Sequence, residues 1–228
     1  KIFDSIDVLG GGDNKLGSAD DVHVEQGDPV NVINGNMYIT KTDLSTHAPG
    51  MPFDFIRVYG SRDGSDGPLG MGWTHNFNIS LTPPPGDTSA AIVKDADGNS
   101  IVFIQTAPGI FSPDIGNYSS LTKIGAGYVW EKKEKISYSF NSDGKLQYIY
   151  DSNNNTSFLI YDEQGRLKNI TDTAERNYAL TYDTNNRITE ITDPSGRKVT
   201  YTYDSNGNLA RVVDTVGNST EYEYNDTN

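Results

Sequence analysis

The sequence contains no cysteine among its 228 residues, and only 18 basic residues stand against 31 acidic ones, for a formal net charge of −13. Disulfides, thiolate metal sites and cysteine nucleophiles are therefore excluded together. A field of this sign repels phosphate backbones and anionic lipid, so we expect no nucleic-acid partner. No apolar run approaches the roughly 18 residues of a membrane-spanning helix, and we expect no membrane insertion.

Histidines and helical patterns are also scarce. The three histidines, His23, His47 and His75, lie far apart in the sequence, so a histidine metal site is not expected. No segment has the apolar periodicity of an amphipathic helix. The chain does have 14 tyrosines, 23 glycines and 10 prolines, a mixture typical of many short strands joined by turns. These counts predict an all-β protein without a cofactor.

A period of 21 residues dominates the second half of the chain. Aromatic, acidic and aliphatic residues recur in phase, which is typical of a repeat protein. The in-phase series are Phe140, Tyr161, Tyr182, Tyr203, Tyr224; Asn141, Asp162, Asp183, Asp204, Asn225; Leu146, Leu167, Ile188, Leu209; Ile149, Ile170, Ile191, Val212; and Asp151, Asp172, Asp193, Asp214.

Each 21-residue unit predicts two strands and two turns. In "FLIYDEQGRLKNITD", residues 158–172, the Asp accepts backbone hydrogen bonds in a turn that the Gly closes with a positive φ. The units together predict a continuous antiparallel hairpin meander. Leu167 and Ile170 break strict alternation, which indicates a bulge without showing which face each residue occupies. The residues predicted to build the repeats are Tyr161, Asp162, Gly165, Leu167, Tyr182, Asp183, Ile188, Tyr203, Asp204, Gly207 and Leu209.

The region before the repeats predicts a separate β-rich domain. Asn34-Gly35 and Asp97-Gly98 are hairpin turn signals between alternating apolar residues. The segment "FDFIRVYGS", residues 53–61, predicts a strand, and the proline-rich residues 82–87 predict a stiff connection. We therefore predict a lead-in at residues 1–26, a β domain at 27–125 and the repeat array at 126–228.

The repeat unit and the segment before the repeats both resemble parts of a known family. The units "YDEQGRLKNITD" and "YDSNGNLARVVD" are similar to the YD repeat of Rhs proteins, teneurins and the C component of Tc toxin complexes. The segment from "GDPVNVINGNMYITKTDLS" to "GPLGMGWTHNF" resembles the domain that precedes the repeats in bacterial Rhs proteins. The resemblance covers roughly residues 27–225. It implies a β-strip that winds into a hollow shell, which encloses a C-terminal toxin in bacterial members and serves adhesion in teneurins.

The chain departs from this family in two respects. It has about four repeats, whereas a closed shell in the family needs many more, so the resemblance implies a curved sheet or partial shell. The aspartate pair with which the family releases its C-terminal cargo has no match, because Asp193-Pro194-Ser195-Gly196 is a single occurrence within an ordinary repeat. We therefore carry over no protease activity.

Three other kinds of site were weighed. The Tyr-Asp pairs favour structure over catalysis, because a reaction needs one special site and not four equal ones. Asp95, Asp97 and Asn99 resemble the start of a calcium loop, but Thr106 stands where a bidentate Glu is needed. The acidic segment at residues 12–21 leaves a weak calcium site open. Asn-X-Ser/Thr sequons, which direct glycosylation in some hosts, occur at Asn78, Asn117, Asn154, Asn155, Asn169, Asn218 and Asn225.

These observations predict a non-enzymatic structural module of an exported bacterial YD/Rhs-repeat protein, secreted or on the cell surface. A fifth repeat begins at Tyr224, and so short an array should expose apolar surface that its neighbours normally cover. Its expected partners are further repeats of the same protein or other copies, which would build a shell or filament. Two alternatives stay open: the first part of a shell around a C-terminal toxin, and an adhesion module that binds glycans or a receptor.

Overall fold

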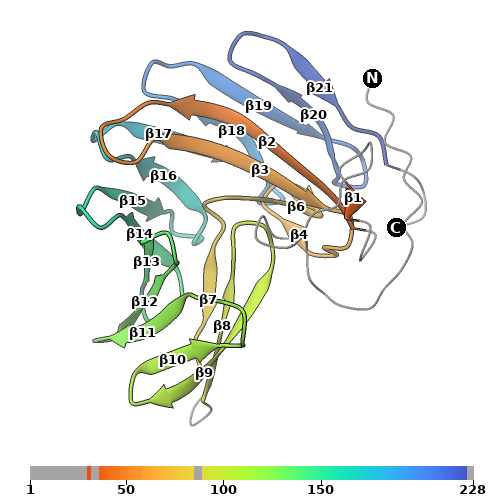
Figure 1. Ribbon diagram of the computed structural model, residues 1–228. Coiled ribbons are helices and arrows are strands. Elements are labelled where there is room, and N and C mark those ends of the chain that lie inside the picture. Colours follow the sequence, from red (N-terminus) through yellow and green to blue (C-terminus); the bar gives the residue numbers. More distant parts are fainter. Residues whose placement is uncertain (1–29, 32–35, 85–88, 225–228) are drawn as a thin grey trace.

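The computed structural model describes residues 30–31, 36–84 and 89–224. All regular structure in these residues is β-strand, and every paired strand is antiparallel (Figure 1). The predicted all-β hairpin meander is therefore confirmed. The strands form a small N-terminal sheet, a short two-stranded ribbon and one long sheet that contains the repeats.

The N-terminal sheet has the strand order β1-β2-β3-β6. Its strands are β1 (Val30–Asn31), β2 (Asn36–Thr46), β3 (Phe53–Gly60) and β6 (Trp73–His75), and the ribbon consists of β4 (Asp66–Gly67) and β5 (Gly70–Met71). The Asn34-Gly35 turn lies outside the described residues, but β1 and β2 on either side of it pair antiparallel, as a hairpin requires.

The long sheet contains the next 15 strands in simple sequence order. They are β7 (Ser80–Thr82), β8 (Ala90–Lys94), β9 (Ser100–Ala107), β10 (Ile110–Pro113), β11 (Ser120–Ile124), β12 (Gly127–Glu131), β13 (Ser137–Phe140), β14 (Leu146–Tyr150), β15 (Thr156–Tyr161), β16 (Leu167–Thr171), β17 (Asn177–Tyr182), β18 (Ile188–Thr192), β19 (Lys198–Tyr203), β20 (Leu209–Val213) and β21 (Ser219–Glu221).

This sheet continues past the proline-rich connection and past the predicted boundary between residues 125 and 126. The proline-rich connection begins at the end of β7, and β7 pairs with β8. The position between residues 125 and 126 falls in the turn between the paired strands β11 and β12. The hairpin around Asp97-Gly98 joins β8 to β9, as the sequence predicts.

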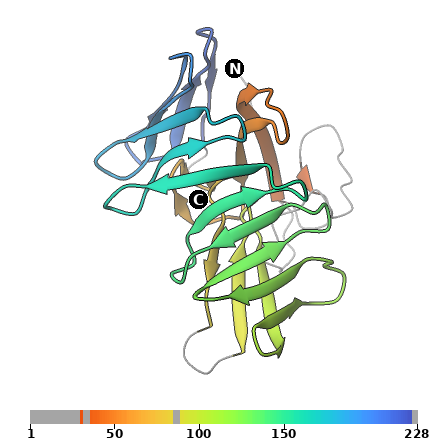
Figure 2. The ribbon, with the colours of Figure 1, turned by 90° about the vertical axis from the view of Figure 1, so that its left-hand side faces the viewer.

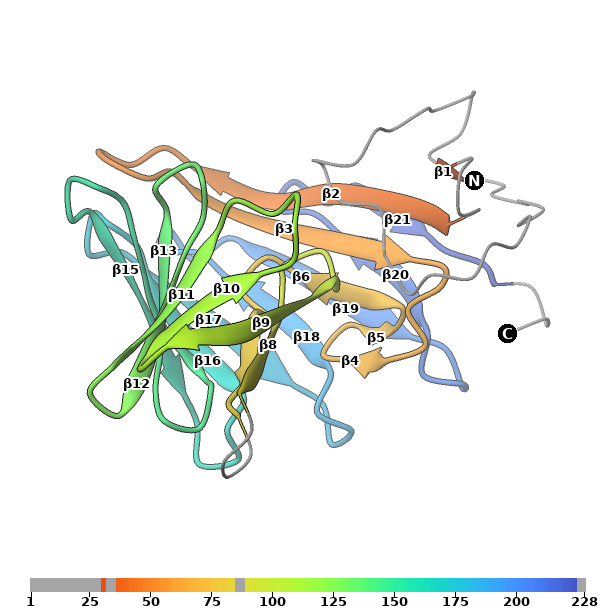
Figure 3. The same ribbon diagram turned by 60° about the horizontal axis from the view of Figure 1, so that its bottom comes forward.

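The first half of the long sheet curls back on itself. The Leu81 N–H on β7 donates to the Gly144 carbonyl before β14 (2.9 Å), and Ser80 forms an isolated bridge with Lys145. Figure 3 shows β8 to β13 wrapping around a common interior. The buried face of these strands fills that interior with the side chains of Val93, Phe103, Leu121, Trp130 and Phe140.

The second half of the long sheet is covered by the N-terminal sheet. β2 and β3 cross in front of β17 to β20, and the view turned by 90° shows the same neighbourhood (Figures 1 and 2). The ring of Phe53 on β3 stacks on that of Tyr178 on β17, and Tyr178, Ile191 and Tyr201 are almost fully buried. The chain's own N-terminal strands therefore cover this face of the repeats.

A bulge in each repeat explains the broken alternation. Ile160 pairs with Asn169 while Tyr161 pairs with Leu167, so Lys168 is an extra residue in β16. The same shift occurs at Tyr182 and at Tyr203. The extra residue returns the side chain after it to the same face, so Leu167 and Ile170 both point into the core, exposed by 6% and 0%.

Candidate functional site

The in-phase tyrosines form a ladder along the long sheet. Each phenol donates a hydrogen bond to a backbone carbonyl 15 residues earlier, at the start of the strand in the preceding unit. The bonds run from Tyr161 to Leu146 (2.7 Å), Tyr182 to Leu167 (2.7 Å), Tyr203 to Ile188 (2.6 Å) and Tyr224 to Leu209 (2.9 Å). Each unit is therefore joined to the one before it by the same contact, and such a bond contributes about 1 kcal/mol to stability.

The aspartates that follow these tyrosines organise the turns. Oδ1 of Asp183 accepts from the backbone N–H of Asn185 (2.8 Å) and Arg187 (2.9 Å), and Oδ2 accepts from the Arg187 side chain (3.1 Å). Asp162 binds Arg166 in the same way, and Asp204 binds Asn208. The turns close with positive φ at Gly165 (79°), Asn186 (64°) and Gly207 (89°), where Gly and Asn are the least strained residues.

A second set of turns on the opposite edge repeats this design. Asp172 binds Arg176, and Asp193 binds Arg197 through both carboxylate oxygens. Burial alone would raise the pKa of Asp172 and Asp193, but the hydrogen bonds and charge of the arginine outweigh it, so each pKa lies below its usual value. The aspartates are therefore fixed as carboxylates at neutral pH.

The basic residue of each turn also covers the next tyrosine ring. The guanidinium carbon of Arg166 lies 4.8 Å from the ring centre of Tyr182, and that of Arg187 lies 4.6 Å from Tyr203. Leu167, Ile188 and Leu209 fill the core beneath, exposed by 6%, 0% and 0%. The ladder bonds and turn contacts of these residues therefore lie within one unit or between adjacent units, and they run along the sheet.

The most unusual cluster joins the two sheets. Arg57 on β3 is 2% exposed, and its Nε lies 2.5 Å from Oδ2 of Asp43 on β2. Oδ2 of Asp43 also accepts from the Tyr201 hydroxyl (2.6 Å), and Nη1 of Arg57 donates to the Tyr222 hydroxyl (3.2 Å). Asp43 is the bulged residue between Thr42 and Leu44, and a bulge re-aims a side chain in this way.

The repeat period shows that this cluster is specific to certain units. The inner-face position that bears Tyr201 and Tyr222 is occupied by Leu159 and Leu180 in the two preceding units. Leucine there packs in the core, exposed by 6% and 5%. The repeat fold therefore accepts leucine at this position, and the two tyrosines occur where the buried ion pair of the N-terminal sheet needs hydroxyl partners.

The N-terminal domain makes other contacts that each involve a residue of one repeat unit only. Nε1 of Trp73 donates to the Tyr224 hydroxyl (2.8 Å). The Thr173 hydroxyl donates to the Pro49 carbonyl (2.8 Å), at the turn between β2 and β3. The interface thus extends from the turn before β17 to the end of the described chain, and no short-range sequence pattern reveals it.

The sequence predicts no metal site but leaves the acidic turns open as weak candidates. Among residues 30–31, 36–84 and 89–224, no group of three or more His, Asp or Glu side chains is arranged to hold an ion. His75 on β6 is buried, and His47 is exposed. His23 and the acidic residues 12–21 lie outside the described part. No helix in the described part is long and apolar enough to span a membrane.

The acidic turn between β8 and β9 has a cation of its own. Nζ of Lys132 lies 3.0 and 2.8 Å from the two carboxylate oxygens of Asp95. Burial, with a smaller contribution from Asp95, raises the pKa of Asp97 to about 6. Oδ1 of Asn99 is buried there without a hydrogen-bond partner. The protein's own ammonium group thus occupies the position beside Asp95 where a cation would lie.

Comparison with known proteins identifies both halves of the chain. Residues 27–103 match the family described as a domain of unknown function, DUF6531. Residues 161–198, 182–215 and 203–228 match the family described as RHS Repeat. These matches occur in the order that the resemblance implies, with the domain ahead of the repeats.

Three curated relatives share part of the sequence. The chain is 34% identical over 136 residues to the tRNA nuclease WapA of Bacillus subtilis strain 168. The same identity and length relate it to the tRNA(Glu)-specific nuclease WapA of Bacillus subtilis subsp. natto and to the tRNA3(Ser)-specific nuclease WapA of Bacillus spizizenii. In each comparison the match covers 59% of this chain and 6% of the relative.

Proposed function

Because the chain belongs to the YD/Rhs-repeat family and carries the domain that precedes the repeats, we propose that it is a non-enzymatic scaffold at the start of an exported bacterial repeat protein. Its N-terminal sheet would cover the inner face of the first repeats and provide a rigid base from which further repeats extend. The buried cluster of Arg57, Asp43, Tyr201 and Tyr222 carries this proposal, because it joins the preceding domain to particular units of the array.

A scaffold role is also supported by how the periodic residues are used. The tyrosines and aspartates of the repeats satisfy one another along the sheet. A catalytic site would need a nucleophile or a proton-transfer group held free for substrate. The relatives' names describe nucleases, but the match covers 6% of their length, so nuclease activity need not reside in the matched part.

The first test is an assay of the isolated chain with tRNA. The proposal expects no cleavage above that of a buffer control, and no shift of the tRNA on a native gel, because a net charge of −13 opposes phosphate binding. Cleavage that persists after repurification and is lost on mutation of a described residue would overturn the scaffold proposal.

The proposed partner of the scaffold is a further stretch of repeats. Strand β21 pairs on one side with β20 and is the end strand of the described sheet, and an end strand offers its backbone groups for pairing. Pairing with later repeats would build a shell, and pairing with other copies would build a filament. Light scattering during size-exclusion chromatography separates these outcomes, since a well-behaved monomer at micromolar concentration counts against the filament.

A second candidate function is adhesion, which is supported by a pair of exposed aromatic rings. On the outer face of β14 and β15, the rings of Tyr148 and Phe158 lie 5.6 Å apart and are exposed by 39% and 44%. The corresponding residues one unit later are Asn169 and Ala179, so the fold does not need aromatic residues there. A glycan array probed with the parent chain and with the Phe158→Ala variant tests this function, and the variant should lose the binding. Glycan binding that is equal for the two proteins would exclude this surface as the binding site.

A further inference from the structure

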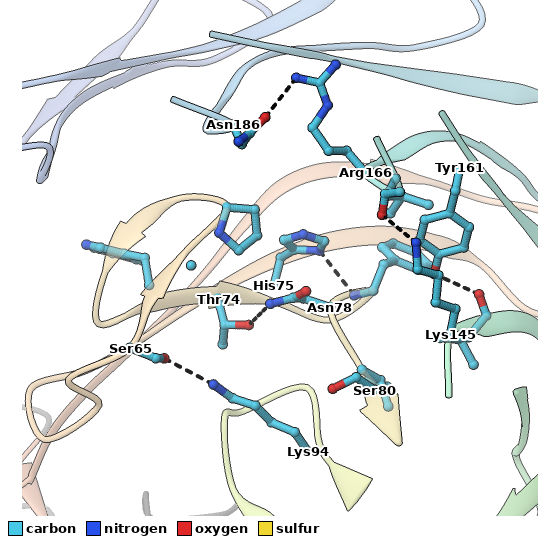
Figure 4. Close-up of a pocket in the computed structure, with 18 of the residues that line it drawn as sticks. Ser65, Thr74, His75, Asn78, Ser80, Lys94, Lys145, Tyr161, Arg166 and Asn186 are labelled. Carbon is cyan, nitrogen blue, oxygen red and sulfur yellow. Dashed lines mark hydrogen bonds between the residues drawn. The ribbon is translucent and has the colours of Figure 1, made fainter. Parts of the chain in front are cut away.

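A cavity of about 580 Å³ lies between the N-terminal strands and the turns of the first repeats (Figure 4). One wall comes from the β4–β5 ribbon, β6 and the residues leading into β7. The opposite wall comes from the turns that precede β14, β16 and β18. Its size lies within the roughly 300–1,000 Å³ typical of small-molecule sites. The described contacts of the scaffold leave this space open.

Cationic side chains outnumber carboxylates around the cavity. Lys94, Lys145 and Arg166 line it, whereas Asp66 is the single lining carboxylate. Lys94 and Arg166 are each paired with an aspartate outside the lining, Asp63 and Asp162. The buried His75 also lines the cavity, and its Nδ1 accepts from the Phe77 N–H (3.3 Å), which leaves the ring proton on Nε2. Burial lowers the pKa of His75 to about 3, so the imidazole is a neutral donor at physiological pH.

Lys145 differs from its counterparts in the next two units. Arg166 and Arg187 stand at the same position of the repeat, and each pairs with the aspartate of its own turn, Asp162 or Asp183. In the turn of Lys145 that aspartate is replaced by Asn141, whose Oδ1 accepts from the Lys145 backbone N–H (2.9 Å). The Lys145 ammonium donates instead to a neutral group, the Gly165 carbonyl (3.1 Å).

This arrangement leaves the ammonium of Lys145 with hydrogen-bonding capacity. An ammonium has three N–H donors, and the bond to Gly165 uses one of them. Figure 4 shows Lys145, His75 and Arg166 around the same space, each from a different element. The apolar side chains of Phe77, Leu146 and Leu167 also line the cavity and can contact a non-ionic portion of a ligand.

We propose that this cavity binds a small molecule through one anionic group, a carboxylate or a phosphate, with Lys145 as its principal charged contact. An acceptor-only group complements the excess of donors, and charge-assisted hydrogen bonds are the stronger kind. The inference goes beyond the scaffold role and is independent of it, since a scaffold can exist with or without a ligand.

The test uses the whole chain and three probes: inorganic phosphate, benzoate and the uncharged analogue benzamide. Titration is followed by NMR at the backbone amides of Leu146 and Gly165 and at the His75 ring. We expect saturable shifts with phosphate or benzoate at about millimolar concentration, and none with benzamide. Saturation by only one of the two anions identifies which group the site accepts.

Two substitutions test the role of Lys145. Lys145→Gln should weaken anion binding roughly tenfold, the effect of losing a charge-assisted hydrogen bond, and Lys145→Arg should retain it. Lys168→Gln removes the same charge from an exposed residue of β16 that does not line the cavity, and it should change nothing.

Three results would overturn the proposal. They are the absence of saturation with both anions, equal binding of benzoate and benzamide, and equal loss in the Lys145→Gln and Lys168→Gln variants. Lys145 also lies over the Tyr161 ring, 5.3 Å from its centre, so the Arg variant and the unperturbed amide spectrum separate a lost contact from a disturbed fold.

Discussion

The repeats and the N-terminal sheet are held by different kinds of contact. In the repeats, each tyrosine of the ladder has counterparts that make the same contact one unit away. At the junction with the N-terminal sheet, the contacts of Arg57 and Asp43 occur once and join residues more than 150 positions apart. Stability in the repeats is therefore distributed, whereas the position of the N-terminal sheet depends on a few side chains.

This difference also separates two uses of tyrosine. Tyr182 and Tyr203 continue a ladder that would extend unchanged along more repeats. Tyr201 and Tyr222 instead replace the leucines of earlier units and serve only the junction. Departures from the repeat pattern thus mark the residues that distinguish one unit from another.

Loss of Arg57 should have the largest effect. Arg57→Met leaves the buried carboxylate of Asp43 with the Tyr201 hydroxyl but without its ion-pair partner, and breaking a buried pair in this way costs about 3–5 kcal/mol. Urea denaturation of the parent and the variant measures the loss. In the double variant Asp43→Leu with Arg57→Met, most of the stability should return, because no buried charge is left.

An ion pair in the repeats is the control for this experiment. Arg197→Met removes the side-chain partner of Asp193, but the carboxylate keeps its hydrogen bonds from the backbone N–H groups of Ser195 and Arg197. Since the Arg197 side chain is also 52% exposed, the loss should be much smaller. Equal losses for Arg57 and Arg197 would show that the junction is no more specific than an ordinary turn.

Alanine substitutions at two glycines test the curled part of the sheet against a turn with no close neighbour. Gly144 and Gly196 have φ angles of 79° and 80°, so alanine at either costs about 1 kcal/mol of backbone strain. A Cβ at Gly144 would also collide with the backbone carbonyl of Leu81, whereas one at Gly196 meets nothing within 4 Å.

We therefore expect Gly144→Ala to lose roughly 3 kcal/mol, within the range of overpacking effects, and Gly196→Ala to lose about 1 kcal/mol. Hydrogen exchange should show the additional loss at β7 and β14, which meet at Gly144. Equal losses in the two variants would mean that the contact between β7 and the turn before β14 contributes nothing to stability.

The contrast between the repeats and the junction also explains which features of the structure can be predicted from the sequence. The 21-residue period predicts the hairpins because partners such as Tyr182 and Leu167 lie 15 residues apart. It also indicates the bulge at Lys168, although the facing of Leu167 and Ile170 required the strand register. Local turn chemistry and periodicity contain that information.

The junction is invisible to the same reasoning. Arg57 stands in a strand whose burial alternates from Phe53 to Arg57 and is continuous from there to Gly60. Nothing near Arg57 in sequence reveals Tyr222 as its partner, 165 residues away. One signal was present: Tyr201 and Tyr222 depart from Leu159 and Leu180 at one position of the repeat. A departure of this kind indicates a contact from outside the array but does not identify the contacting residue.

Loss of a single hydrogen bond of the tyrosine ladder should lower stability only modestly. Tyr182→Phe removes the bond to the Leu167 carbonyl and should cost about 1 kcal/mol, measured by urea denaturation. Tyr148→Phe is the matched control, because Tyr148 lies outside the ladder and is 39% exposed, and it should change stability by less than about 0.5 kcal/mol. A loss of several kcal/mol for Tyr182→Phe would contradict distributed stability in the repeats.

The smallest effect is expected from the pH dependence of two kinds of turn aspartate. The pKa of Asp193 is lowered, so the stability it contributes is present above its unfolded pKa of about 3.9 and is lost as pH falls through the lower folded value. The pKa of Asp97 is raised to about 6. The folded protein therefore holds that proton more tightly, and stability falls as pH rises from about 4 to 6.

Asp97→Asn removes this unfavourable charge, which faces Asp95 from its own turn, Lys132 from the turn between β12 and β13, and Tyr38 from β2. We expect the variant to be more stable than the parent by about 1 kcal/mol at pH 7 and equal to it near pH 4, measured by urea denaturation at both values. A gain of the same size at both pH values would mean that the charge of Asp97 is not what distinguishes this turn from those of the repeats.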